Sequence, residues 1–203
     1  MAILPLVHHT DPILKKVAEP FDFKNPPADP AQIAIDLTET MIANKGLGLA
    51  ANQVGLPYRV FVLTGETVYA CFNPKIVSFS EEETYMNEGC LSYPGMVVKI
   101  KRPSEIRVRF TLPNGNVVTT KLAGLSARCF MHELDHLDGV VHLNRATLYH
   151  RQQAWKTHKA YMKIQKKTDT SKLTNAINSI LPGKLKTEAD VKKVVETLEE
   201  MGL

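Results

Sequence analysis

Two histidines four residues apart are the part of this sequence whose types and spacing most directly predict chemistry. His132 and His136 flank Glu133 in the pattern His-Glu-x-x-His. An α-helix turns by about 100° per residue, so side chains four positions apart lie on one face and can offer two imidazoles to one ion. Glu133 lies beside the first histidine, where its carboxylate can take a proton from water at an open coordination position. The spacing therefore predicts a helical metal site in which Glu133 is the general base.

The residues on either side of this motif favour a helix that begins near Gly124. Gly139 follows the motif and is a typical helix stop. The alternative is a surface helix with two unrelated histidines, since the five-residue pattern also occurs by chance. Against that alternative, the residues before the histidines predict a buried face, which is formed by Leu125, Cys129 and Phe130.

Length and composition predict one catalytic domain with room for an appendage. The chain has 203 residues, 44% hydrophobic and 23% charged, as in ordinary globular proteins. The N-terminus has neither a basic lead nor a small-residue cleavage site, and no apolar run reaches membrane-spanning length. Three cysteines, an odd number, argue against a disulfide framework. We therefore expect a protein of the reducing cytoplasm with no membrane segment.

Periodicity predicts both helices and strands before the metal helix. A helix is expected from Asp29-Pro30 to a terminator at Gly46, because apolar residues recur every fourth position at Ile33, Leu37 and Met41. Strand-like runs follow at residues 59–63, 68–72, 75–79 and 97–101. Residues 105–112 and 117–122 alternate around Pro113-Asn114-Gly115, which predicts a hairpin.

Two glycine-containing segments lie among these elements. Residues 46–55 carry so little side-chain bulk that another backbone or an extended peptide could approach them, although a Gly-rich turn would look the same. In residues 88–95, Cys90 follows a glycine and precedes an expected Pro94-Gly95 turn, and its thiol could be a third metal ligand. A lone cysteine is more often a small buried hydrophobic residue, which is what we expect of Cys71 and Cys129.

Three segments in register, residues 46–53, 88–92 and 132–137, together resemble the peptide deformylases, which remove the N-formyl group from nascent polypeptides. The similarity covers roughly residues 5–165, and three ordered motifs are far more specific than one. The resemblance implies an α+β fold with antiparallel sheets around a central metal-binding helix. It also implies hydrolysis of N-terminal formyl-methionine with release of formate.

The resemblance also implies roles for particular residues. The metal ligands would be Cys90, His132 and His136. Glu133 would be the acid and base, and the Gln53 side chain with the Leu91 backbone N–H would form the oxyanion site. Glu88 and Arg102 match positions that pair near the site, and the best candidates for the formyl-methionine pocket are Gly48, Leu125 and Cys129. The family typically uses Fe(II), and we expect that Zn(II) or Ni(II) can substitute for it.

Two other functions fit parts of the sequence. His142 completes the metzincin protease pattern His-Glu-x-x-His-x-x-Gly-x-x-His, with His132, His136 and His142 as ligands. A metzincin also needs a Met-turn beyond the third histidine, and Met162 and Met201 are poorly placed for one. The other alternative is a non-catalytic metal domain that binds RNA, but a structural zinc site needs a fourth ligand and none is evident.

The C-terminal part of the chain is basic. Residues 145–203 hold 12 Lys and Arg against 6 Asp and Glu, whereas the first 144 residues hold 13 against 15. We expect a catalytic domain over residues 1–167, ending in a helix from Ala146 to Lys167, and a helical extension over residues 168–203. In bacterial relatives the matching helix docks on the ribosome. The alternative is a lysine-rich helix that is only solvated.

Overall fold

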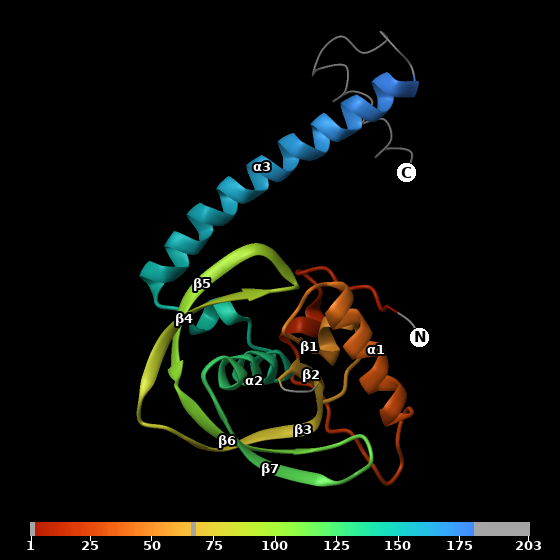
Figure 1. Ribbon diagram of the computed structural model, residues 1–203, viewed down its shortest axis with the longest axis vertical. Coiled ribbons are helices and arrows are strands. Elements are labelled where there is room, and N and C mark those ends of the chain that lie inside the picture. The colour runs from red at the N-terminus through yellow and green to blue at the C-terminus, as the bar shows by residue number, and fades with distance from the viewer. Residues whose placement is uncertain (1–2, 66–67, 181–203) are drawn as a thin grey trace. The chain divides into compact units, whose positions relative to one another are not determined.

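The computed structural model describes residues 3–65 and 68–180, which divide into two compact units, one ending at Ala154 and one beginning at Trp155. The first unit holds two sheets (Figure 1). The larger sheet has the order β1-β2-β3-β6-β7, and all its pairings are antiparallel. Its strands are β1 (Gly48–Ala50), β2 (Val60–Thr64), β3 (Val68–Phe79), β6 (Glu105–Thr111) and β7 (Val117–Ala123).

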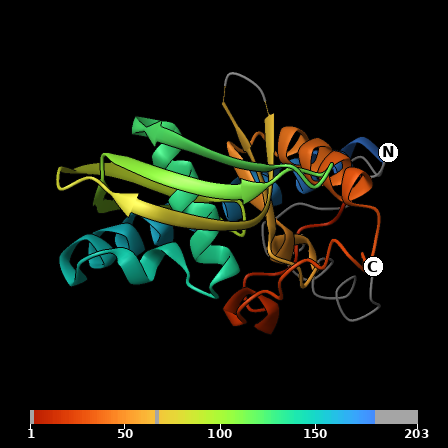
Figure 2. The same ribbon diagram turned by 90° about the horizontal axis from the view of Figure 1, so that it is seen from below.

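The smaller sheet is a two-stranded antiparallel ribbon of β4 (Glu83–Cys90) and β5 (Tyr93–Pro103). Helix α2 (Gly124–Leu137) lies in the middle of the first unit with both sheets around it (Figure 1). Seen from below, strands of the larger sheet run across this helix (Figure 2). The predicted α+β fold, with antiparallel sheets around the metal-binding helix, is therefore confirmed.

The core is built where the helices face the larger sheet. On one side α2 packs on β1, β2 and β7, and the rings of Phe61 and Phe130 meet edge to face with their centroids 5.0 Å apart. On the other side lies α1 (Pro30–Ala43), which buries the predicted four-residue stripe of Ile33, Leu37 and Met41. Each such side chain contributes about 1.5–3 kcal/mol on full burial. The larger sheet is thus covered on both sides by apolar helix faces.

A third cluster lies over the ribbon. β5 buries Met96, Val98 and Ile100 against the segment after α2, and Ala146 and Ala154 belong to the same cluster. This segment contains the short 3-10 helix η3 (His142–Arg145) and the first two turns of α3 (Leu148–Ile180). The start of α3 is therefore part of the first unit.

Helix ends follow the local chemistry, with one difference from expectation. Asp29 caps α1 as predicted, since its side chain accepts a hydrogen bond from Ala31 N at 2.9 Å and Pro30 begins the helix. The residue with left-handed backbone after α1 is Lys45, with φ 57°, and not the predicted Gly46. In the β6–β7 hairpin Gly115 has φ 84°, as the turn requires.

Two predictions about strands and turns were wrong, and one strand was missed. Residues 68–72 and 75–79 form one strand, because a bulge at Asn73, with φ 48°, admits Pro74 into β3. β4 was not predicted at all, since its residues are mostly polar and show no apolar alternation. The expected Pro94-Gly95 turn is part of β5, and the ribbon turns at Leu91 and Ser92 instead.

The C-terminal helix is longer than predicted. A single helix, α3, runs on through residues 168–180, where the sequence pattern suggested a separate helix. The expected last helix, around residues 187–198, lies outside the described residues. Among the described helices none combines the length and apolarity needed to cross a membrane.

Candidate active site

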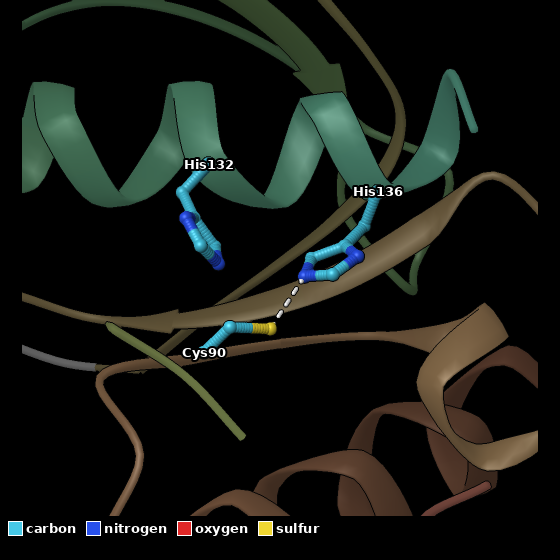
Figure 3. A group of neighbouring side chains, drawn as sticks. All are labelled: Cys90, His132 and His136. Carbon is cyan, nitrogen blue, oxygen red and sulfur yellow. Dashed lines mark hydrogen bonds between the residues drawn. The ribbon is translucent and has the colours of Figure 1, made fainter. Parts of the chain in front are cut away.

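The three proposed metal ligands converge between α2 and the end of β4. His132 and His136 project from one face of α2, and Cys90 is the last residue of β4 (Figure 3). One ligand atom from each lies within 4.8 Å of the other two, and the Cys90 Sγ is 3.1 Å from His136 Nε2. Among the side chains that the structure describes, those of residues 3–65 and 68–167, these three form the one group that could hold an ion.

Polar contacts hold the imidazole of His132 and the backbone at His136. His132 Nδ1 lies 3.1 Å from Glu88 Oε2, so its Nε2 is left for the ligand cluster. The Asn52 side-chain amide donates to the backbone carbonyl of His136 at 2.5 Å, which anchors the end of α2 to the segment after β1. The carboxylate–histidine pair is the arrangement that usually supports a metal-binding imidazole.

The electrostatics of the ligand set favour a cation. Burial alone would lower the pKa of His132, but its interactions with Cys90 and Glu88 raise that pKa to about 10. Burial, helped by the positive charge of His132, lowers the pKa of His136 well below its ordinary value. The buried cluster thus favours positive charge beside Cys90 and Glu88. A divalent ion bound by Cys90, His132 and His136 would supply that charge. The residues therefore fit a metal.

Glu133 is buried beside this cluster. Its side chain is 4% exposed, and its Oε2 has no hydrogen-bond partner among the described residues. Burial raises the pKa of Glu133 to about 7, against the opposing effect of His132. Gly48 packs directly on this carboxylate, because a Cβ at position 48 would collide with Glu133 Oε1 and come within 2.8 Å of Cys129 Sγ. Only glycine leaves room for Glu133 in this position.

Gln53 and Leu91 lie next to the cysteine ligand. The side-chain oxygen of Gln53 accepts from Ala50 N at 2.9 Å, which sets the direction of the amide. Its Nε2 then donates to Ser92 Oγ at 3.0 Å and points at the Cys90 Sγ, 3.6 Å away. Leu91 begins the turn that follows Cys90. A buried amide donor thus faces the ligand cluster.

Comparison with known proteins agrees with this geometry. A model of the family described as polypeptide deformylase matches residues 3–152. The chain belongs to the polypeptide deformylase family. A peptide deformylase of Rhizobium meliloti is 39% identical over 150 residues, which cover 71% of this chain and 85% of that protein.

Solved structures of deformylases have the same fold. The structure of peptide deformylase from Thermotoga maritima matches with a TM-score of 0.67 at 36% identity, covering 72% of this chain and 99% of that one. A peptide deformylase from Synechococcus elongatus in complex with actinonin matches with a TM-score of 0.70 at 30% identity, and the match covers 75% of this chain and 86% of that one.

Family membership establishes the activity of the chain. It is a metal-dependent hydrolase that removes the formyl group from N-terminal formyl-methionine of nascent polypeptides and releases formate. The non-catalytic and metzincin alternatives are therefore wrong. His142, the third metzincin ligand, is 1% exposed, and its ring lies 5.5 Å from that of His132. It is absent from the ligand group, and both its ring nitrogens lack a partner among the described residues.

A pocket with a volume of about 570 Å³ opens beside the ligand cluster. The three predicted substrate-binding residues, Gly48, Leu125 and Cys129, all line it. Leu125 is 55% exposed, so it lies at the rim, whereas Cys129 is buried and its thiol donates to the Leu47 carbonyl at 3.3 Å. Burial raises the pKa of the thiols of Cys71 and Cys129, as expected of cysteines that pack as hydrophobic residues.

A buried ionic network supports the deformylase site, and sequence reasoning found only part of it. Arg102 donates to both Glu88 oxygens, at 2.7 and 2.9 Å, and this pair had been expected. Burial raises the pKa of Glu88, but His132 and Arg102 outweigh it and hold that pKa well below its ordinary range. The members that were missed are Arg128, Asp135 and Arg145. Helical spacing could have revealed Arg128, because it lies four residues before His132.

Proposed function

We propose that Cys90, His132 and His136 hold the metal ion of this deformylase. The observation that carries this proposal is their convergence from two separate elements within 4.8 Å, beside the buried carboxylate of Glu133, whose Oε2 has no hydrogen-bond partner among the described residues. An ion held by these ligands would act as a Lewis acid and activate water for attack on the formyl carbon.

Glu133 is the proton-transferring group in this proposal. It lies next to one ligand on α2 and lines the pocket. The absence of a side chain at Gly48 leaves room for its carboxylate. Its pKa of about 7 would let the carboxylate accept a proton from the attacking water and deliver it to the leaving amine. The amine is the new N-terminus of the peptide.

Gln53 and the Leu91 backbone N–H would stabilise the negative charge that develops on the formyl oxygen. The support is the direction of the Gln53 amide, which is fixed by Ala50 and points its Nε2 towards the ligand cluster. A preorganised donor of this kind typically lowers the barrier by about 2.7–4 kcal/mol. The pocket lined by Gly48, Leu125 and Cys129 would receive the methionine side chain.

The resident metal is proposed to be Fe(II), with Zn(II) or Ni(II) able to replace it. A thiolate with two imidazoles suits all three ions, so the preference for Fe(II) rests on the resemblance to the family. The test is to purify the protein without oxygen, measure its metal content, and follow formate release from a formyl-Met peptide. A more active, oxygen-labile iron form and a slower, stable zinc form are expected. Equal rates and equal lifetimes in air would contradict the proposal.

A second proposal concerns the basic helix and the ribosome. Lys156, Lys159 and Lys163 are exposed and lie on one face of α3 by their spacing. No acidic residue occurs between Ala146 and Lys167. Such a face can bind RNA phosphates through release of counterions. We propose that this part of α3 docks the enzyme on the ribosome in the cytoplasm, and that residues 168–203 form an extension to a catalytic domain of residues 1–167.

A further inference from the structure

Arg128 connects the metal-binding helix to the ribbon that carries the cysteine. It lies one turn before His132 on α2, and its side chain is 4% exposed. Its Nη1 donates to Glu88 Oε1 and to the Ile100 carbonyl, both at 3.0 Å, and its Nη2 donates to the Thr84 carbonyl at 2.7 Å. One guanidinium from α2 therefore binds both strands of the ribbon.

This connection matters because the proposed ligands lie on two different bodies. α2 packs mainly on β1, β2 and β7 of the larger sheet, whereas Cys90 ends a strand of the separate ribbon. No strand pairing joins the ribbon to the larger sheet in the described part of the chain. The distance between Cys90 and the two histidines is therefore set by side-chain contacts, both those between α2 and the ribbon and the contact of Gln53 with Ser92 in the ribbon turn.

Glu88 is where these contacts meet. Its Oε1 accepts from Arg102 Nε and Arg128 Nη1, and its Oε2 accepts from Arg102 Nη2 and lies against His132 Nδ1. These four contacts use the acceptor capacity of a carboxylate. Arg102 belongs to β5, in the same ribbon as Glu88, so the guanidinium of Arg102 orients the Glu88 carboxylate within the ribbon. Arg128 is the arginine that reaches Glu88 from the helix.

We propose that Arg128 is a positioning residue for the metal site. It holds the ribbon at the distance from α2 at which Cys90 and His132 bind the same ion, and it acts through Glu88. This inference rests on the ligand assignment proposed above. Arg102 makes a second connection to α2 through Asp135 at 2.7 Å, on the far side of His132. The two arginines thus bracket the histidine, and loss of Arg128 leaves the ribbon held to α2 by fewer side-chain contacts.

Arg128→Met is the informative substitution, since it keeps an unbranched stem at the pocket wall and removes all the donors. Arg59→Met is its matched control, because Arg59 joins the segment before β2 to Asp138 at the end of α2 and does not touch Glu88. The dissociation constants of Zn(II) and Co(II) are measured on the full chain by competition with a chromophoric chelator. The absorption spectrum of the Co(II) form reports whether the thiolate is bound.

We expect Arg128→Met to weaken metal binding by about 10- to 100-fold and to reduce the thiolate-to-Co(II) band, as is typical when a supporting residue of a metal ligand is lost. Arg59→Met should bind both ions as the unchanged protein does. Arg128→Lys, which keeps the charge but not the fork, should fall between them, and it serves as the test variant if Arg128→Met does not fold.

A double-mutant cycle separates positioning from a general structural role. In a Glu88→Gln background, Arg128→Met should weaken metal binding by much less than it does alone, because its effect passes through Glu88. Additive losses, or metal binding by Arg128→Met as tight as that of Arg59→Met, would overturn the proposal. An unchanged protein whose Co(II) form lacks a thiolate band would instead refute the ligand assignment on which the proposal rests.

Discussion

α2 and the β4–β5 ribbon each supply part of the metal site, and the chain positions the two parts by different means. On α2, regular backbone geometry places His132 and His136 on one face, and no distant residue is needed to define their spacing. On the ribbon, the position of Cys90 depends on tertiary contacts, among them the buried contacts of Glu88 with Arg102 and Arg128. The helix part of the site is fixed locally, whereas the ribbon part depends on buried ionic contacts.

The largest expected effect comes from removing the ligand on the ribbon. Cys90→Ala should lose metal and deformylase activity together, because two imidazoles alone hold a divalent ion weakly. The measurements are metal content after dialysis and formate release from a formyl-Met peptide.

The control for Cys90→Ala is His142→Leu, which removes both ring nitrogens at a buried position of similar size. This variant should keep its metal, since His142 is absent from the ligand group. A metal-loaded Cys90→Ala protein beside a metal-free but folded His142→Leu protein would reverse the assignment.

Glu133→Gln tests whether α2 contributes a base as well as ligands. The amide has nearly the same shape but cannot accept a proton, so kcat should fall by about 10²- to 10⁴-fold while metal content stays near normal. Metal analysis and steady-state kinetics on the same sample separate these effects. Full turnover by Glu133→Gln would exclude the role of general base.

Gln53→Ala should have a smaller effect. Removal of one oxyanion donor typically costs about 10²- to 10³-fold in kcat, with metal retained. Ser92→Ala is the matched control, because it removes a partner of the Gln53 Nε2 but leaves the amide held by Ala50. If Ser92→Ala and Gln53→Ala lower kcat equally, the amide matters for packing and not for the oxyanion.

The difference between α2, which is defined by local spacing, and the ribbon, which is held by tertiary contacts, also explains which elements the sequence could predict. The metal helix, α1 and the β6–β7 hairpin were predicted, because each is encoded by local spacing or a turn signal. β4 could not be predicted, since its polar residues are held in a strand by pairing with β5 and by contacts from Arg128 to the Thr84 carbonyl. Asp135 lay within the motif, but its pairing with Arg102 and Arg145 depends on tertiary structure.

α3 was predicted in type but not in length. The pattern of its residues gives no clear apolar stripe, so nothing in the sequence marked continuity between residues 167 and 173. What the sequence did show is the absence of acidic residues from Ala146 to Lys167.

Reversing charge on α3 should separate ribosome binding from catalysis. We expect the triple variant Lys156→Glu, Lys159→Glu and Lys163→Glu to co-sediment with ribosomes much less than the unchanged protein does at low salt. Each lysine–phosphate contact adds about 0.7–0.9 to the slope of log K against log salt, so the salt dependence should also become shallower. Formate release from a short formyl-Met peptide should stay the same, because these residues lie outside the unit that holds the active site.

The control for net charge replaces two exposed lysines of the first unit, Lys15 and Lys24, by Glu. Lys45 is also exposed, but it is left unchanged because it lines the pocket. The Lys15 and Lys24 pair should leave both co-sedimentation and turnover near those of the unchanged protein. If this pair weakens co-sedimentation as much per charge as the α3 substitutions do, the attraction is a property of total charge and α3 is not the docking element. Undiminished co-sedimentation by a folded α3 triple variant would also reject docking through this helix. A loss that is specific to α3 and steepest at low salt would support it, since a localised cationic face gains affinity mainly by releasing counterions from RNA.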